Sequence, residues 1–180
     1  MTRVAMLREQ LREAHQFLEG TMEGVTPDQA HWTPAGMALP IGAHYGHIVI
    51  LEDFGIGAIV AGGTPLFAGR RAGRTGFSAL PPLPSPASPG IPDFGEWARA
   101  VKVDLPTARG YAREVYEASD RSLASLDEAA LDRELDLSAV GVGRRTVGWF
   151  LSNPLLGNVG MHCGEISCLK GLQGLKGYPA

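Results

Sequence analysis

The feature that most constrains this fold is a stretch, residues 62–92, that is too rich in proline and glycine to form a long helix or strand. More than half of the chain's 13 prolines lie in it. Antiparallel neighbouring helices need only a short loop, whereas parallel neighbours need a connection about as long as the helices themselves. We therefore expect the helices on either side of this crossover to run in the same direction.

Apolar residues recur at helical spacing on both sides of the crossover, and no segment shows the alternation of a strand. The segment SAVGVGRR (138–145) is interpreted as a glycine-rich loop. The spacing predicts helices over residues 3–19, about 39–60, 93–101 with 105–126 as one helix in two pieces, and about 147–172 with a kink at Pro154. The expected fold is all-α: one domain over residues 1–180, a four-helix bundle with one long crossover.

Composition excludes several classes of function. A length of 180 residues fits one domain, and a net charge of −3 argues against nucleic acid as a partner. The first 20 residues lack the apolar core of a signal peptide, and no apolar run is long enough to span a membrane. Cys163 and Cys168 are five residues apart in one predicted helix, which favours two reduced thiols over a disulfide. We expect a cytoplasmic protein with no membrane partner.

Two histidines lie in the most apolar predicted helix. His44 and His47 are three residues apart, so they project from roughly the same side of the helix, and Glu52 follows a little over one turn later. A single histidine in such a helix is more often a core residue with one hydrogen bond than a ligand. His15 and His31 lie on a charged helix and beside a loop, and no role is predicted for them.

The closing helix carries the second group of candidates. Asn158, His162 and Glu165 share one face at spacings of four and three. Two histidines four apart would be a strong metal signal, but an amide oxygen is a poor zinc ligand. Cys163 is turned about 100° away from His162 and is interpreted as a small buried apolar residue. The chain has no G-x-S-x-G elbow, P-loop or dinucleotide-binding fingerprint.

Three segments together resemble the DinB superfamily of metalloenzymes. They are LREAHQFLEGTMEGVTPDQAHWTP (11–34), IGAHYGHIVILEDF (41–54) and NVGMHCGEISCLKGLQGLKGYP (158–179), and the crossover also fits, so the resemblance covers essentially the whole chain. It implies an up-down-down-up bundle that holds a divalent metal such as nickel, zinc or manganese with three histidines. One comes from the second helix and two come from the fourth. It also implies homodimers and reactions that use low-molecular-weight thiols.

His47 and His162 match two of these histidines, and Asn158 stands at the position of the third. Three interpretations remain open. The site binds metal with Asn158, Glu165 or His44 as the substitute ligand; it is a pocket for another ligand that binds metal weakly or not at all; or it is a vestige in a protein kept for binding a partner.

Two functions of different class follow. The first is a metal-dependent transferase or hydrolase, of the thiol-dependent S-transferase type. It would act on a small molecule or thiol, with Glu165 or Glu52 as proton acceptor and Tyr45, Trp97 and Trp149 as candidates to line the pocket. The second is a metal-free binding or dimerisation module on the same fold, with Asn158 and His162 in a buried hydrogen bond.

Overall fold

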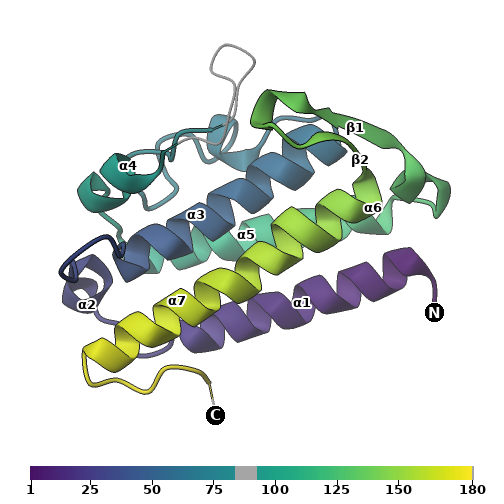
Figure 1. Cartoon of the computed structure of the whole chain (residues 1–180). Helices are drawn as coiled ribbons and strands as arrows, with labels where there is room; N and C mark the ends of the chain where they lie inside the picture. Colours follow the sequence, from purple (N-terminus) through teal and green to yellow (C-terminus); the bar gives the residue numbers. More distant parts are fainter. Residues whose placement is uncertain (84–92, 180) are drawn as a thin grey trace.

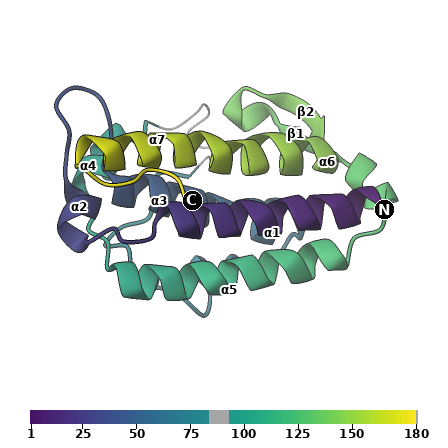
Figure 2. The same cartoon turned by 90° about the horizontal axis from the view of Figure 1, so that it is seen from below.

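The computed structural model describes residues 1–83 and 93–179. The protein is mostly helical, as predicted, and four long helices lie side by side: α1 (Arg3–Thr21), α3 (Ile41–Phe54), α5 (Leu105–Ala124) and α7 (Asn158–Leu172) (Figure 1). Helices α3 and α5 run in one direction and α1 and α7 in the other; from below, α1 lies between α7 and α5 (Figure 2). No helix in the described ranges is long and apolar enough to cross a membrane.

Helix α3 forms the centre of this arrangement. It is buried on almost every side because α5 and α7 pack along it and shorter elements cover its other faces, and Ile48, Val49 and Ile50 are each at most 1% exposed. The long helices on its flanks are amphipathic instead. Helix α5, for example, buries Ala108, Ala112 and Val115 at helical spacing, whereas Arg113 and Glu117 on its other face are exposed. The core therefore forms around α3.

Shorter elements connect the long helices. Helix α2 (Pro27–His31) follows α1, helix α4 (Gly95–Ala100) precedes α5, and helix α6 (Val147–Phe150) precedes α7. Short 3-10 turns lie at Leu66–Ala68, Ala129–Asp132 and Ser138–Val140. The predicted crossover is irregular over most of its described part, and residues 84–92 of it lie outside the described residues.

The buried carboxylate of Asp53 ties the crossover to the helices. Its two oxygens accept the backbone N–H groups of Leu66 and Phe67, each at 2.9 Å, and the hydroxyl of Tyr111 on α5 donates to it at 2.6 Å. A buried carboxylate is costly unless it is hydrogen-bonded, so this site holds the start of the crossover, α3 and α5 in one relative position.

The prediction that no segment forms a strand is wrong. Strands β1 (Glu134–Leu137) and β2 (Gly143–Thr146) pair antiparallel, so a hairpin occupies the predicted loop at 138–145. In β1 the side chains of Leu135 and Leu137 are buried and those between them are exposed. The alternation in Glu-Leu-Asp-Leu was visible, but four residues are too few to distinguish a strand from an irregular segment.

Two π-helical segments extend the helices that carry the candidate site. Gly55–Val60 continues α3, and Leu151–Gly157 joins α6 to α7. The second contains Pro154, which has no N–H and clashes with a regular α-helical carbonyl, so the predicted kink takes the form of a wider turn. The two segments are close: a Cβ on Gly55 would be 3.2 Å from side-chain atoms of Phe150 and Leu155.

Gly76 offers a test of how the crossover packs. Its φ is +85°, and a Cβ there would lie 2.8 Å from Cα of Ala108 and 2.9 Å from the carbonyl oxygen of Asp104. Gly73 has a similar φ of +68° with open space around it. We expect Gly73→Ala to cost about 1 kcal/mol for the backbone conformation, and Gly76→Ala to cost about 1–3 kcal/mol more, because backbone atoms cannot yield. Urea unfolding of both variants measures the difference, and equal losses would contradict this packing.

Candidate metal site and pocket

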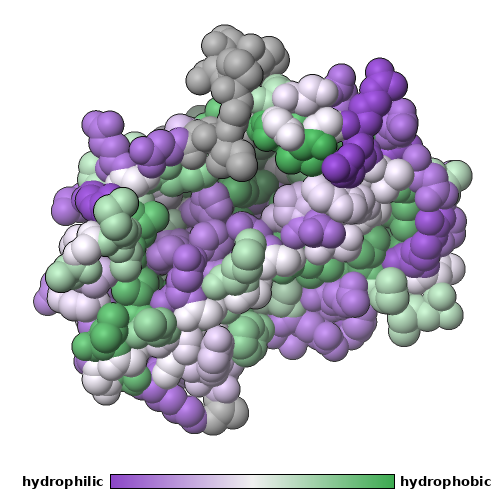
Figure 3. Space-filling model, in the orientation of Figure 1, coloured by the Kyte–Doolittle hydropathy of each residue, from purple (hydrophilic) through white to green (hydrophobic). Residues whose placement is uncertain are grey.

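A cavity of about 660 Å³ lies between α3 and α7, with further walls from α4 and the β1–β2 hairpin. In the space-filling view this face is hollowed, with hydrophilic residues toward α4 and hydrophobic residues near the hairpin (Figure 3). The volume is within the range of roughly 300–1,000 Å³ that small-molecule sites occupy.

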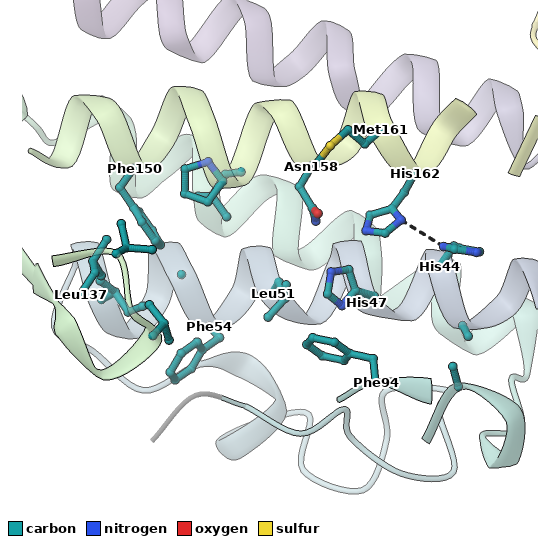
Figure 4. A pocket seen from close by; sticks show the side chains of 18 of the residues that line it. His44, His47, Leu51, Phe54, Phe94, Leu137, Phe150, Asn158, Met161 and His162 are labelled. Atoms are coloured by element: carbon teal, nitrogen blue, oxygen red, sulfur yellow. Dashed lines mark hydrogen bonds between the residues drawn. The ribbon is translucent and has the colours of Figure 1, made fainter. Parts of the chain in front are cut away.

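Each long helix turns one stripe of side chains toward the cavity. Residues three or four apart lie on one helix face, and the lining positions follow that spacing on both helices. The stripe on α3 comprises Ala43, His44, His47, Leu51 and Phe54, and that on α7 comprises Asn158, Met161, His162 and Glu165. The close-up shows the histidines and Asn158 gathered at one end of the cavity (Figure 4).

Three side chains bring potential ligand atoms together at that end. Nδ1 of His44 lies 3.0 Å from Nδ1 of His162 and 3.1 Å from Oε2 of Glu165, and Glu165 also makes a hydrogen bond with His162. The His44 side chain is 6% exposed and the Glu165 side chain 53%. This cluster, His44–His162–Glu165, therefore lies where the cavity meets solvent.

His47 and Asn158 lie beside the cluster. The His47 ring packs edge-on against the rings of His162 and Phe94, with centroids 4.7 and 4.5 Å away. Burial lowers the pKa of His47 to about 3, the nearby His162 and His44 lower it too, and the hydrogen bond that His47 donates to Asn158 acts against them. Burial also lowers the pKa of His44, although the charge of Glu165 opposes this. Both imidazoles are thus neutral at pH 7, the form that binds metal.

The donor atoms of the cluster suit a divalent cation. Two ligands at right angles, each about 2.1 Å from an ion, are about 3.0 Å apart, which matches the separation of the two Nδ1 atoms. Two imidazoles with one carboxylate is a donor set found for catalytic zinc and for non-haem iron, and in both cases it leaves coordination positions open. The residues present therefore fit a metal ion.

The structure brings five of the predicted site residues to one place and leaves Glu52 elsewhere. His44, His47, Asn158, His162 and Glu165 all line the cavity. Glu52 points toward α1 instead, where its Oε2 pairs with Nε2 of His15 at 2.8 Å. Trp97 and Trp149 line the cavity as expected, whereas Tyr45 does not: its hydroxyl donates to Glu19 in the core.

His15 has a role that the sequence did not predict. It is 8% exposed and its ring stacks on that of Tyr116, with centroids 3.8 Å apart. The signal was present, since His15 follows Leu11 by four residues and precedes Leu18 by three on the buried stripe of α1. The charged residues on the rest of the helix obscured it. His15 therefore belongs to the interior, paired with Glu52.

The fold and the site together define a class of protein: a mostly helical chain with a histidine–carboxylate cluster at one end of a largely apolar cavity. The family model of the DinB superfamily matches residues 10–166, so the chain belongs to the DinB superfamily. A crystal structure of a conserved protein from Enterococcus faecalis has a TM-score of 0.78 to this chain at 19% identity, covering 96% of this chain and 97% of that one. At that identity the likeness shows the fold alone. No curated protein matches.

The His15–Glu52 pair predicts a large effect on stability. Glu52 is 2% exposed and His15 is its hydrogen-bond partner within the described chain, so His15→Leu leaves a buried carboxylate uncompensated. We expect a loss of about 3–5 kcal/mol in the free energy of unfolding, much of it recovered in His15→Leu/Glu52→Leu, where both polar groups are gone. Urea unfolding measures both variants, and an unchanged stability for the single variant would contradict the pairing.

The two cysteines should differ sharply in reactivity. Cys163 is fully buried and its pKa is raised to about 11 by burial, whereas Cys168 is exposed. Because the thiolate is the reactive form, we expect a disulfide reagent at pH 8 to titrate one thiol in the folded protein and two in denaturant. Cys168→Ser should abolish the folded-state reaction, and rapid reaction of the remaining thiol would reopen Cys163 as a nucleophile.

Proposed function

We propose that this protein binds a divalent cation between His44, His162 and Glu165 and is a metal-dependent enzyme that acts on a small molecule in the adjoining cavity. The observation that carries the proposal is the convergence of two imidazole nitrogens and one carboxylate oxygen within 4.8 Å of one another at the end of that cavity. A cluster that only stabilised the fold would not need a cavity of about 660 Å³ beside it, whereas an active site would.

Membership of the DinB superfamily supports the proposal. We propose that α1, α3, α5 and α7 are the up-down-down-up bundle, because α3 and α5 run in the same direction. We also propose that Asn158 stands at the position of a family histidine, and that His44 and Glu165 join His162 as ligands in place of His47 and Asn158. A thiol-dependent transferase or hydrolase remains the reaction class we favour, and nickel, zinc and manganese remain the candidate ions.

The chain's own residues would have distinct roles. A bound cation would supply a means of lowering the pKa of water or a thiol toward neutrality. His44 and His162 are held by opposite helices, so the packing of α3 on α7 sets the spacing of the ligands. His47 and Asn158 lie between the cluster and the rest of the cavity, where they can orient a substrate by hydrogen bonds. The apolar walls would exclude water from that region once a substrate fills it.

A metal-free binding module is the second candidate. The feature that favours it is the hydrogen bonding within the cluster, since His44, His162 and Glu165 satisfy one another without an ion. Such a protein would keep the cavity for a ligand and would have no use for the metal-binding geometry. We also propose a reducing, cytoplasmic setting, since Cys163 and Cys168 are free thiols, and the homodimer stays a prediction.

Metal analysis of the purified protein separates the two candidates. We expect about one equivalent of a divalent transition metal, and at least about 100-fold weaker binding in His44→Ala, His162→Ala and Glu165→Gln, because each removes one of three ligands. Asn158→Ala should have a smaller effect. His31→Ala and Glu117→Gln remove matched side chains outside the cavity and should leave the metal content unchanged.

The outcomes are distinct. Loss of metal in the three cluster variants with retention in the two controls supports the enzyme. A wild-type protein that binds no nickel, zinc or manganese in equilibrium dialysis, with all variants folded by circular dichroism, would leave the binding module as the function.

A further inference from the structure

The cavity is polar at one end and apolar over the rest of its length. The polar end holds the cluster together with His47 and Asn158. The remaining length runs toward the hairpin, and its walls are hydrocarbon: Leu51, Phe54, Ile59, Leu137, Val140 and Phe150. The close-up shows this order directly, with Phe54, Leu137 and Phe150 far from His44 and His162 (Figure 4).

The cavity is elongated because it follows two antiparallel helices. On α3 its lining extends from Ala43 to Phe54, eleven steps along the helix that span about 16 Å at 1.5 Å per residue, and continues into the π-helical segment. On the opposite side the lining runs from Glu165 back to Trp149. A compact polar metabolite would leave most of this length unfilled, whereas a chain-shaped hydrocarbon would fill it.

The charges along the lining bear on the polar group of the ligand. Glu165 lies at the polar end and Asp136 at the hairpin end, and the described lining contains no lysine or arginine. A carboxylate or phosphate head group would therefore find acidic residues and no basic partner. An uncharged head group that donates and accepts hydrogen bonds, such as a hydroxyl or thiol, suits His47 and Asn158.

The far end of the cavity is shaped by irregular structure. The two π-helical segments face each other there, with Gly55 of one against Leu155 of the other and against Phe150 of α6. The hairpin adds Leu137 and Val140 from outside the helices. Departures from regular helix of this kind occur frequently at functional sites, and here both lie in the walls of the apolar half.

We propose that the ligand of this cavity is an amphiphile with one small uncharged head group at the His47–Asn158 end and an unbranched hydrocarbon tail that extends along α3 to the β1–β2 hairpin. That this amphiphile is a substrate rests on the proposed function, but its tail can bind to the cavity without a cation. Val140 and Ile59 would then limit the length of the tail.

The test uses 1-alkanols of four to ten carbons as probes, with binding measured by isothermal titration calorimetry on the protein as purified and again after chelation. Each buried methylene should raise the affinity two- to fourfold, so 1-decanol, with six more methylenes, should bind at least about 60-fold more tightly than 1-butanol. Decane-1,10-diol should bind at least fivefold more weakly than 1-decanol, because its second hydroxyl enters the apolar half without a partner.

Two variants of the same 3-10 turn locate the tail. Val140→Asp places a carboxylate on the cavity wall and should weaken 1-decanol binding at least tenfold. Ser138→Asp introduces the same charge two residues away, at an exposed position outside the lining, and should leave the affinity unchanged. The alkanol series on the unaltered protein keeps the test decisive if Val140→Asp does not fold.

Several results would overturn the inference: an affinity independent of chain length, equal binding of decane-1,10-diol and 1-decanol, or tighter binding of decanoate than of 1-decanol after chelation. A protein that binds no metal but shows the chain-length dependence would refute the proposed metal site and leave the amphiphile in place. A protein that binds metal but shows no chain-length dependence would refute the amphiphile and leave the proposed metal site in place.

Discussion

Helix α3 is apolar on nearly every side, so it has to be covered by α5, α7 and the shorter helices α2 and α4 at once, and the site depends on that covering. Antiparallel packing of α7 on α3 places His162 opposite both His44 and His47. Asp53 fixes the other flank, since it holds the crossover and Tyr111 of α5 by three hydrogen bonds. A shift of α3 along its axis would therefore separate the histidines and break the bonds of Asp53 together.

The periodic, local features of the fold could be predicted from the sequence, because the spacing of apolar residues within one helix depends on that helix alone. That spacing indicated α1, α3, α5 and α7, and Pro154 marked the irregular turn before α7. The hairpin could not be predicted with the same ease. Its four-residue strands are stabilised by burial of Leu135 and Leu137 against other segments, which is a tertiary effect that overrides weak local preference.

The candidate site was predictable only in part, for the same reason. The spacing of Asn158, His162 and Glu165 showed that they share one face of a helix, but not which side chain of α3 they would meet. That choice depends on the axial register between two helices 118 residues apart at the His44–His162 contact. Glu52 shows the limit clearly: it is only five residues from His47, yet it faces α1 and pairs with His15.

Register also explains how a site can survive the change proposed at Asn158. Because α3 and α7 are antiparallel, residues earlier in α3 lie opposite residues later in α7. His44, one turn before His47, therefore lies near Glu165, which follows Asn158 and His162 on α7. His162 is common to both sets of neighbours. The donor set we propose is thus displaced toward the solvent end of the cavity. In that set His47 and Asn158 would not be ligands. They lie where the polar and apolar parts meet, so both would be left to form hydrogen bonds with the substrate we propose.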